Sequence, residues 1–321
     1  MKPTLQRRLP QLTTGAIFAA LFVTAGLMYE GFFSARVAVN LFTDNAALGL
    51  TAMGMTLVIF AGGIDLSVGA VAGFTSIFVA TLIEQHHVHP ALAALAALAL
   101  GGVFGAGMGA IIHWFRQPAF LITLAGMFLL RGCAFWLNTE SVGINHPLYE
   151  RMADFAWEIG AVRIPLIALV LAGGLIIGGI IAHYTRFGRN LLALGGNEQS
   201  ALLMGLPIGS AKVWVYTFNS LCATAAGLVG TLYTVSGNPS TGIGLELDAI
   251  AVVVIGGTVL TGGRGHMLGT VFGLLIFGTI QSILLFDGRL SPWWSRIVVG
   301  VLLLAFILLQ RGLVRVAGKA K

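Results

Sequence analysis

Charged residues are scarce in this sequence. Asp, Glu, Lys and Arg make up 9% of its 321 residues and hydrophobic residues make up 57%, whereas a soluble domain carries about 25% charged residues. Water is therefore not the main solvent of this chain. Cysteine is also rare, and Cys133 and Cys222 both fall inside long apolar runs. Two cysteines placed in this way give no basis for a disulfide framework.

Motifs for nucleotides, nucleic acids and metals are missing. The only Gly-Lys pair, at 318–319, is followed by alanine, so there is no phosphate loop and any ATP must bind to another chain. The net charge of +6 is not gathered into a basic stripe, which argues against nucleic acid as a partner. His86, His87 and His89 lie close together without a carboxylate or cysteine ligand, which makes a poor metal site. We expect no cofactor and no metal in this chain.

Long uncharged runs are what the sequence has instead. Several approach the ~20 apolar residues that cross a bilayer as a helix, and backbone groups in lipid must be hydrogen-bonded within the spanning segment. The period-2 pattern of a lipid-facing barrel is absent. We therefore predict an all-α polytopic membrane protein with a single transmembrane domain over residues 1–321. About ten spans are predicted, at residues 11–30, 46–62, 66–84, 90–112, 118–138, 164–184, 212–235, 248–262, 266–286 and 293–310.

Basic residues predict the orientation of these spans. The loops and tails on the side of the N-terminus hold twelve Lys and Arg residues, and those on the other side hold five. Because cytoplasmic loops carry the excess of positive charge, both termini are predicted to be cytoplasmic. Loop 139–163 is then periplasmic and loop 186–212 cytoplasmic.

A helix break is predicted where two long runs meet. Adjacent Gly62 and Gly63 should end one helix, and Asp65 should cap the next by accepting amide hydrogens near the positive end of its dipole. Ser67 and Gly69 complete the motif. One interpretation is a plain cytoplasmic hairpin. The other is a hinge or gate, because broken helices in transporters lie beside the pathway.

A second irregular helix is predicted after Asp248. Only 15 residues separate Asp248 from Arg264, fewer than the ~20 of a straight span, so a tilted, discontinuous or re-entrant helix is expected. Gly256-Gly257-Thr-Val-Leu-Thr echoes Gly62-Gly63-Ile-Asp-Leu-Ser in outline. This echo indicates either an internal repeat or a chance similarity between glycine-rich helices.

The cytoplasmic loop 186–212 should contain one short helix. Asn197 is a good N-cap and Gly205 a good C-terminal stop, and the proline at 207 prevents continuation. Ala201, Leu202 and Met204 would form a small apolar face. That face suits docking in a groove of a soluble protein, although the helix could also lie on the bundle.

Polar residues inside predicted spans are candidates for a solute pathway. Thr51, Thr123 and Asn219 could line a path for a hydroxylated solute, but for any one of them the pattern favours packing or hydrogen bonding between helices. Arg131 differs from them, because a charge in this position needs a partner or water.

The sequence at these positions resembles the permeases of ATP-binding-cassette importers for monosaccharides, which include ribose, xylose, arabinose and galactofuranose permeases. Residues 54–69, Gly-Met-Thr-Leu-Val-Ile-Phe-Ala-Gly-Gly-Ile-Asp-Leu-Ser-Val-Gly, look like the family signature. Arg186-Phe-Gly-Arg189 and Gly195-Gly196-Asn-Glu198 look like its ATPase-facing loop. Within the group, the second permease of the galactofuranose system is most similar, at residues 40–45, 123–132, 144–147 and 291–294.

The resemblance implies a transport subunit of the inner membrane rather than an enzyme. It implies a second, related permease chain, a separate ABC ATPase that binds ATP and Mg²⁺, and a periplasmic sugar-binding protein. Transport would proceed by alternating access. An ion-coupled secondary transporter is one rival, with Arg131 as its only obvious ionisable group in the membrane. An intramembrane hydrolase is another, but the sequence around Ser67 departs from Gly-x-Ser-x-Gly.

Overall fold

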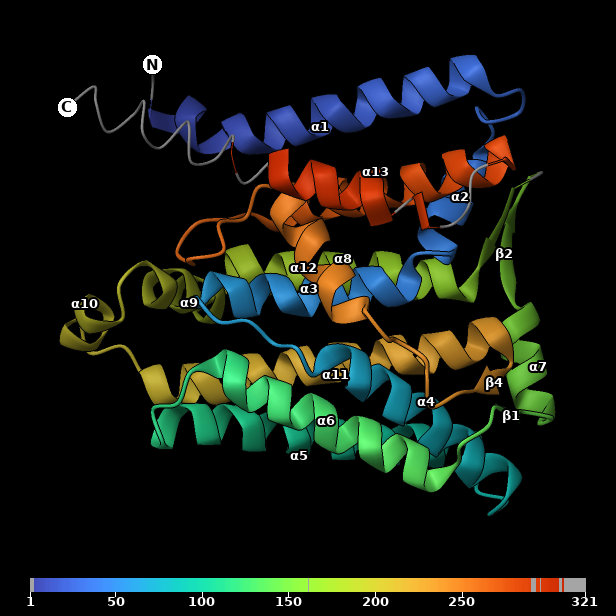
Figure 1. The fold of residues 1–321 in the computed structure, drawn as a ribbon, viewed down its shortest axis with the longest axis horizontal. Helices are drawn as coiled ribbons and strands as arrows, with labels where there is room; N and C mark the ends of the chain where they lie inside the picture. The colour runs from blue at the N-terminus through green and yellow to red at the C-terminus, as the bar shows by residue number, and fades with distance from the viewer. Residues whose placement is uncertain (1–2, 161, 290–292, 295, 306–307, 309–321) are drawn as a thin grey trace.

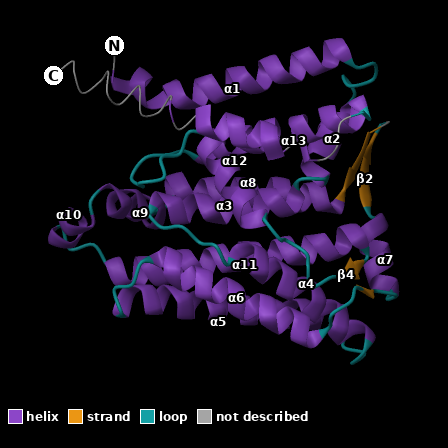
Figure 2. Cartoon of the chain, in the orientation of Figure 1, coloured by secondary structure: helices purple, strands orange, loops and turns teal. Residues whose placement is uncertain are grey.

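The computed structural model describes residues 3–160, 162–289, 293–294, 296–305 and 308. Most of the described chain is helical, and the long helices run side by side along the longest axis of the molecule (Figures 1 and 2). The labelled helices are α1 (Pro3–Met28), α2 (Ala35–Thr43), α3 (Ala46–Phe60), α4 (Val68–Glu84), α5 (Pro90–Trp114), α6 (Ala119–Leu137), α7 (Pro147–Asp154), α8 (Leu166–Tyr184), α9 (Arg186–Gly196), α10 (Glu198–Leu203), α11 (Ile208–Thr234), α12 (Leu245–Ile255) and α13 (Met267–Asp287), and a further short helix spans Arg296–Ala305.

Four short strands form two small antiparallel sheets. Strand β1 (Val142–Gly143) pairs with β4 (Ser236–Gly237), and β2 (Ala156–Ile159) pairs with β3 (Val162–Pro165). Both sheets lie with α7 at one end of the bundle, and α9 and α10 lie at the other end together with the start of α1 (Figure 1). Loops 139–163 and 186–212 are therefore at opposite ends, as predicted.

Six helices of the described chain are long and apolar enough to cross a membrane, namely α1, α5, α6, α8, α11 and α13. A seventh is obtained if α2 and α3, which meet at a bend of 58°, count as one span. The all-α membrane fold is thus supported, whereas the predicted count of ten spans is not confirmed. Helix α4 has 17 residues and α12 has 11, which are short of the ~20 residues of a span. The predicted span 293–310 lies partly outside the described residues.

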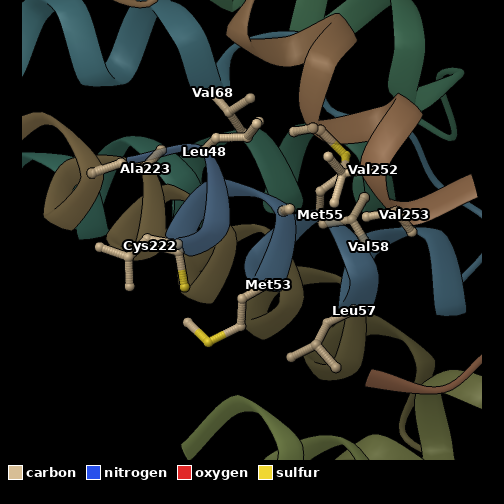
Figure 3. Packing of buried hydrophobic residues seen from close by; sticks show 14 of the residues in the cluster. Leu48, Met53, Met55, Leu57, Val58, Val68, Cys222, Ala223, Val252 and Val253 are labelled. Atoms are coloured by element: carbon tan, nitrogen blue, oxygen red, sulfur yellow. The ribbon is translucent and has the colours of Figure 1, made fainter. Parts of the chain in front are cut away.

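Buried helices form the centre of the bundle. Every residue of α3 except Ala47 is buried, and α3 packs against α11, α8 and α12. Figure 3 shows Met55 of α3 beside Val252 and Val253 of α12. The outer helices instead expose large apolar side chains, such as Trp136 with 85% of its surface accessible. Such an exposed apolar surface is what a lipid-facing helix requires.

The chain reverses after α3 and after α12 through the same backbone pattern. The amides of Gly62 and Gly257 each bond to the carbonyl three residues earlier, at 2.9 and 2.8 Å. The amides of Gly63 and Thr258 each bond to the carbonyl five residues earlier, at 3.0 and 3.2 Å. By this bonding pattern Gly62 is structurally equivalent to Gly257. The sequence echo instead paired Gly62 with Gly256, one residue earlier.

Candidate functional site

The break between α3 and α4 is built around a buried carboxylate. Asp65 is 2% exposed. Its Oδ1 accepts hydrogen bonds from the Ser67 backbone amide at 2.9 Å and from the Ser67 hydroxyl at 2.6 Å. Its Oδ2 accepts a hydrogen bond from Asn219 Nδ2 on α11, at 2.8 Å. One side chain therefore fixes both the start of α4 and the position of the break against α11.

The predicted capping role of Asp65 needs one correction. Asp65 accepts an amide hydrogen as predicted, but the N-cap of α4 is Ser67. Asp65 stands two residues ahead of it, in the irregular segment that joins α3 to α4. The break is thus a buried turn, and its role as a hinge or gate rather than a plain cytoplasmic hairpin stays a prediction. No salt bridge to Asp65 occurs among the described residues.

The glycines of the break fit its geometry. Gly62 has a φ of +77°, which side chains rarely adopt, and it follows the end of α3 as predicted. A Cβ on Gly63 would collide with the Tyr216 hydroxyl, and a Cβ on Gly69 would collide with Glu246. These glycines thus allow α11 and the start of α12 to approach the break closely.

Two contacts of the break were missed by the sequence analysis. The Tyr216 hydroxyl and Glu246 Oε2 are buried and have no hydrogen-bond partner within the described chain. Tyr216 lies three residues before Asn219 and so shares its face of α11; this spacing is the signal that could have found it. Glu246 lies in the first turn of α12.

The predicted pathway residues are buried in the isolated chain. Thr51, Thr123 and Asn219 are each 0% exposed. The Thr51 hydroxyl donates to a carbonyl of its own helix at 2.8 Å. Thr123 donates to Ala119 O at 2.9 Å and lies 3.3 Å from Ile64 O, inside the break. None of the three lines an open path here, and their pathway role stays a prediction.

Arg131 is held by backbone oxygens. Its guanidinium, on α6, donates to Pro239 O at 2.6 Å and to Thr241 O at 2.8 Å. Both acceptors belong to the segment that leads into α12. Arg131, whose charge was expected to need a partner, therefore anchors the chain just ahead of α12.

The loop 186–212 contains two helices rather than one. The additional helix is α9, which was not predicted; it starts at the exposed Arg186 and ends at Gly196. The predicted short helix is α10, and Asn197 is its N-cap, accepting a hydrogen bond from the Ser200 amide at 2.8 Å. Gly205 has a φ of +75° and its amide bonds to Leu202 O at 2.9 Å. Both predicted ends of the helix are confirmed.

The apolar face of α10 differs from the predicted one. Ala201 is 0% exposed and packs inward, whereas Leu202, Leu203 and Met204 are 63%, 89% and 67% exposed. The short helix turns Ala201 towards the bundle, so the exposed apolar face consists of residues 202–204. Glu198 bonds to Lys212 at 2.7 Å and ties α10 to α11.

No group of three or more potential metal ligands occurs in the described part of the chain.

Comparison with known proteins places this architecture among transport proteins. Residues 37–307 match the family described as "Branched-chain amino acid transport system / permease component". The inner membrane ABC transporter permease protein YjfF of Escherichia coli K12 is 47% identical over 96% of this chain and 94% of its own length.

Two further relatives are named for sugars. The ribose import permease protein RbsC of Escherichia coli K12 is 35% identical over 90% of each chain. The fructose import permease protein FruG of Bifidobacterium longum is 34% identical over 98% of this chain and 94% of its own length. All are permeases, which confirms the prediction of a transport subunit rather than an enzyme, and the similarity supports a multi-pass protein of the inner membrane. The chain therefore belongs to the ABC-transporter permease family described as "Branched-chain amino acid transport system / permease component".

Proposed function

We propose that this chain is the channel-forming permease of an ATP-driven importer for a neutral monosaccharide. The observation that carries the proposal is the alignment of nearly the whole chain with permeases named for ribose and fructose import. The buried hydrogen bonds of Asp65 link the break between α3 and α4 to α11, and broken helices in transporters lie beside the pathway.

Galactofuranose is the cargo that we propose. Support comes from the resemblance at residues 40–45, 123–132, 144–147 and 291–294, of which 291–292 lie outside the described residues. Ribose, fructose and L-arabinose are the alternatives, because relatives named for these sugars align over 90% or more of this chain. A neutral polyol needs hydrogen-bonding partners but no counter-ion.

Three partners follow from this function. A periplasmic sugar-binding protein would deliver the cargo, and a separate ATPase would bind ATP and Mg²⁺ against loop 186–212. The exposed apolar face 202–204 is suited to a groove on that ATPase. The second permease is proposed to be a related but different chain. Alternating access would then be driven by ATP binding and reset by hydrolysis.

Reconstitution tests the cargo and the partners together. The chain would be placed in vesicles with its ATPase and binding protein, with and without the second permease, and uptake of labelled galactofuranose, ribose and fructose measured. We expect galactofuranose uptake that needs the second permease. Strong ribose uptake by a complex with two copies of this chain would contradict both the cargo and the heterodimer, while leaving a sugar importer in place.

Orientation is tested with single cysteines on a background without Cys133 and Cys222. Gln199 in α10 and Glu150 in α7 are both exposed, and these two helices lie at opposite ends of the bundle. We propose cytoplasmic termini, so an impermeant thiol reagent added to whole cells should label Glu150→Cys and spare Gln199→Cys. The reverse labelling would invert the topology.

Coupling through α10 is tested at its C-terminal glycine. Gly205→Val forces a β-branched residue into a left-handed conformation, which costs roughly 1–2 kcal/mol, and should misdirect the helix. We expect stimulation of the ATPase to fall. Gly160→Val is the matched control, because Gly160 also has a positive φ and open space but directly follows β2, which lies at the other end of the bundle from α10. Equal ATPase stimulation in the two variants would remove α10 from the coupling path.

A further inference from the structure

Three glycine pairs from distant parts of the sequence meet at the end of the bundle that carries α9. They are residues 62–63 after α3, residues 195–196 at the end of α9, and residues 262–263 between α12 and α13, and we call them the glycine junction. The two helix breaks are the segments 61–67 after α3 and 256–266 after α12. The Gly263 amide donates to the Phe60 carbonyl at 3.1 Å and so links them directly. One helix of the ATPase-facing loop thus contacts both breaks at one place.

Gly195 lies at the centre of this junction. A Cβ on Gly195 would collide with the Phe60 carbonyl oxygen and would lie 2.7 Å from Gly263 N and 3.0 Å from Gly62 N. All three neighbours are backbone atoms, which cannot rotate away as the end of a side chain can. A Cβ on Gly262 would in turn lie 3.0 Å from Gly195 Cα. The three segments therefore touch backbone to backbone.

Such contact suits the transmission of movement. Leu191 and Leu194 are buried and fix α9 in the core, while α10 follows α9 directly and carries the exposed face 202–204. Close-packed interiors transmit displacement rather than absorb it, and no flexible side chain separates Gly195 from either break. A shift of α9 must therefore displace the segments after α3 and after α12 together.

We infer that Gly195 is a positioning residue for transport, through which the loop 186–212 sets both helix breaks at once. This inference rests on the proposed role of that loop in facing the ATPase. It adds a specific residue and a specific pair of responding segments, 61–67 and 256–266.

Two glycine-to-alanine variants test the inference. Gly195→Ala places a methyl group against backbone of both breaks, whereas Gly179→Ala, in α8 and outside the junction, places it in open space, with nothing within 4 Å. In the reconstituted full complex, Gly195→Ala should lower sugar uptake per ATP hydrolysed by about tenfold or more, and Gly179→Ala should leave it within about twofold. Equal ratios in the two assembled variants would overturn the inference.

Hydrogen exchange on the wild-type complex provides a readout that does not depend on how a variant folds. Exchange of segments 61–67 and 256–266 would be compared without nucleotide and with ATP on a hydrolysis-deficient ATPase. Both segments should change together, and Gly195→Ala should abolish the joint change. A response in one segment alone, or in neither, would overturn the inference even if Gly195→Ala fails to assemble. If both segments respond while no sugar is taken up, the cargo assignment fails and the junction stands.

Discussion

The two helix breaks have the same backbone hydrogen-bond pattern but differ in their side chains. After α3 and after α12 the chain reverses through the same pair of amide hydrogen bonds, with Gly62 and Gly257 at positive φ. Only the first break buries a carboxylate, Asp65, which takes three hydrogen bonds. The second break has Arg264 as its only charged residue, and it is exposed. Reversing the chain therefore requires backbone geometry alone, and a buried carboxylate, which is costly, is added at one break for a separate role.

Removing the Asp65 carboxylate should reveal the largest difference in stability contribution between the two breaks. Asp65→Leu deletes three hydrogen bonds and leaves buried donors on Ser67 and Asn219 without an acceptor, so we expect a loss of about 3 kcal/mol in stability and a lower Tm of the purified chain. Asp65→Asn should cost much less. Asn219 Oδ1 is buried without a partner in the described chain, and a flip of the Asn219 amide would let that oxygen accept from the new side chain.

The same pair of variants tests the role of the charge. Uptake would be measured in Asp65→Asn, which keeps the hydrogen bonds and removes the charge. Lost uptake at an unchanged Tm would assign the charge to transport. A Tm in Asp65→Leu equal to that of the wild type would contradict the structural account of the break.

The shared backbone predicts equal effects at the two positive-φ glycines. Gly62→Ala and Gly257→Ala each put a Cβ into a left-handed conformation, at a cost of roughly 1–2 kcal/mol. We expect similar decreases in Tm for the two variants, measured side by side in the same detergent. A drop confined to Gly62→Ala would show that the two reversals are not equivalent, and would weaken the interpretation as an internal repeat.

The start of α13 offers the smallest test. His266 is its N-cap, and Nδ1 accepts a hydrogen bond from the Leu268 amide at 3.1 Å. His266→Ala should cost about 1 kcal/mol for the lost N-cap, together with the loss of the stack between the His266 and His183 rings, whose centroids are 3.8 Å apart. His266→Asn should restore the cap and so recover part of the Tm. If the Tm of His266→Ala fell as far as that of Asp65→Leu, the second break would contribute as much to stability as the first, which would contradict the comparison.

Local features could be predicted from the sequence because their causes are local. Long uncharged runs gave the apolar helices, since backbone in lipid must satisfy its own hydrogen bonds. Asn197 and Gly205 bounded α10, because capping and left-handed stops depend on a few adjacent residues. The short run after Asp248 predicted the short helix α12. The count of ten spans is not confirmed, because hydropathy does not reveal where a helix stops part of the way across.

The tertiary structure alone decided which of these residues act together. Asp65 and Asn219 are 154 positions apart, and no local pattern pairs them; they meet because α11 packs against α3 and α4. The inward turn of Ala201 and the meeting of Gly195 with both breaks have the same origin. Helix type and helix ends follow from short-range energies along the chain, whereas partners in a buried site follow from how close-packed helices fit one another.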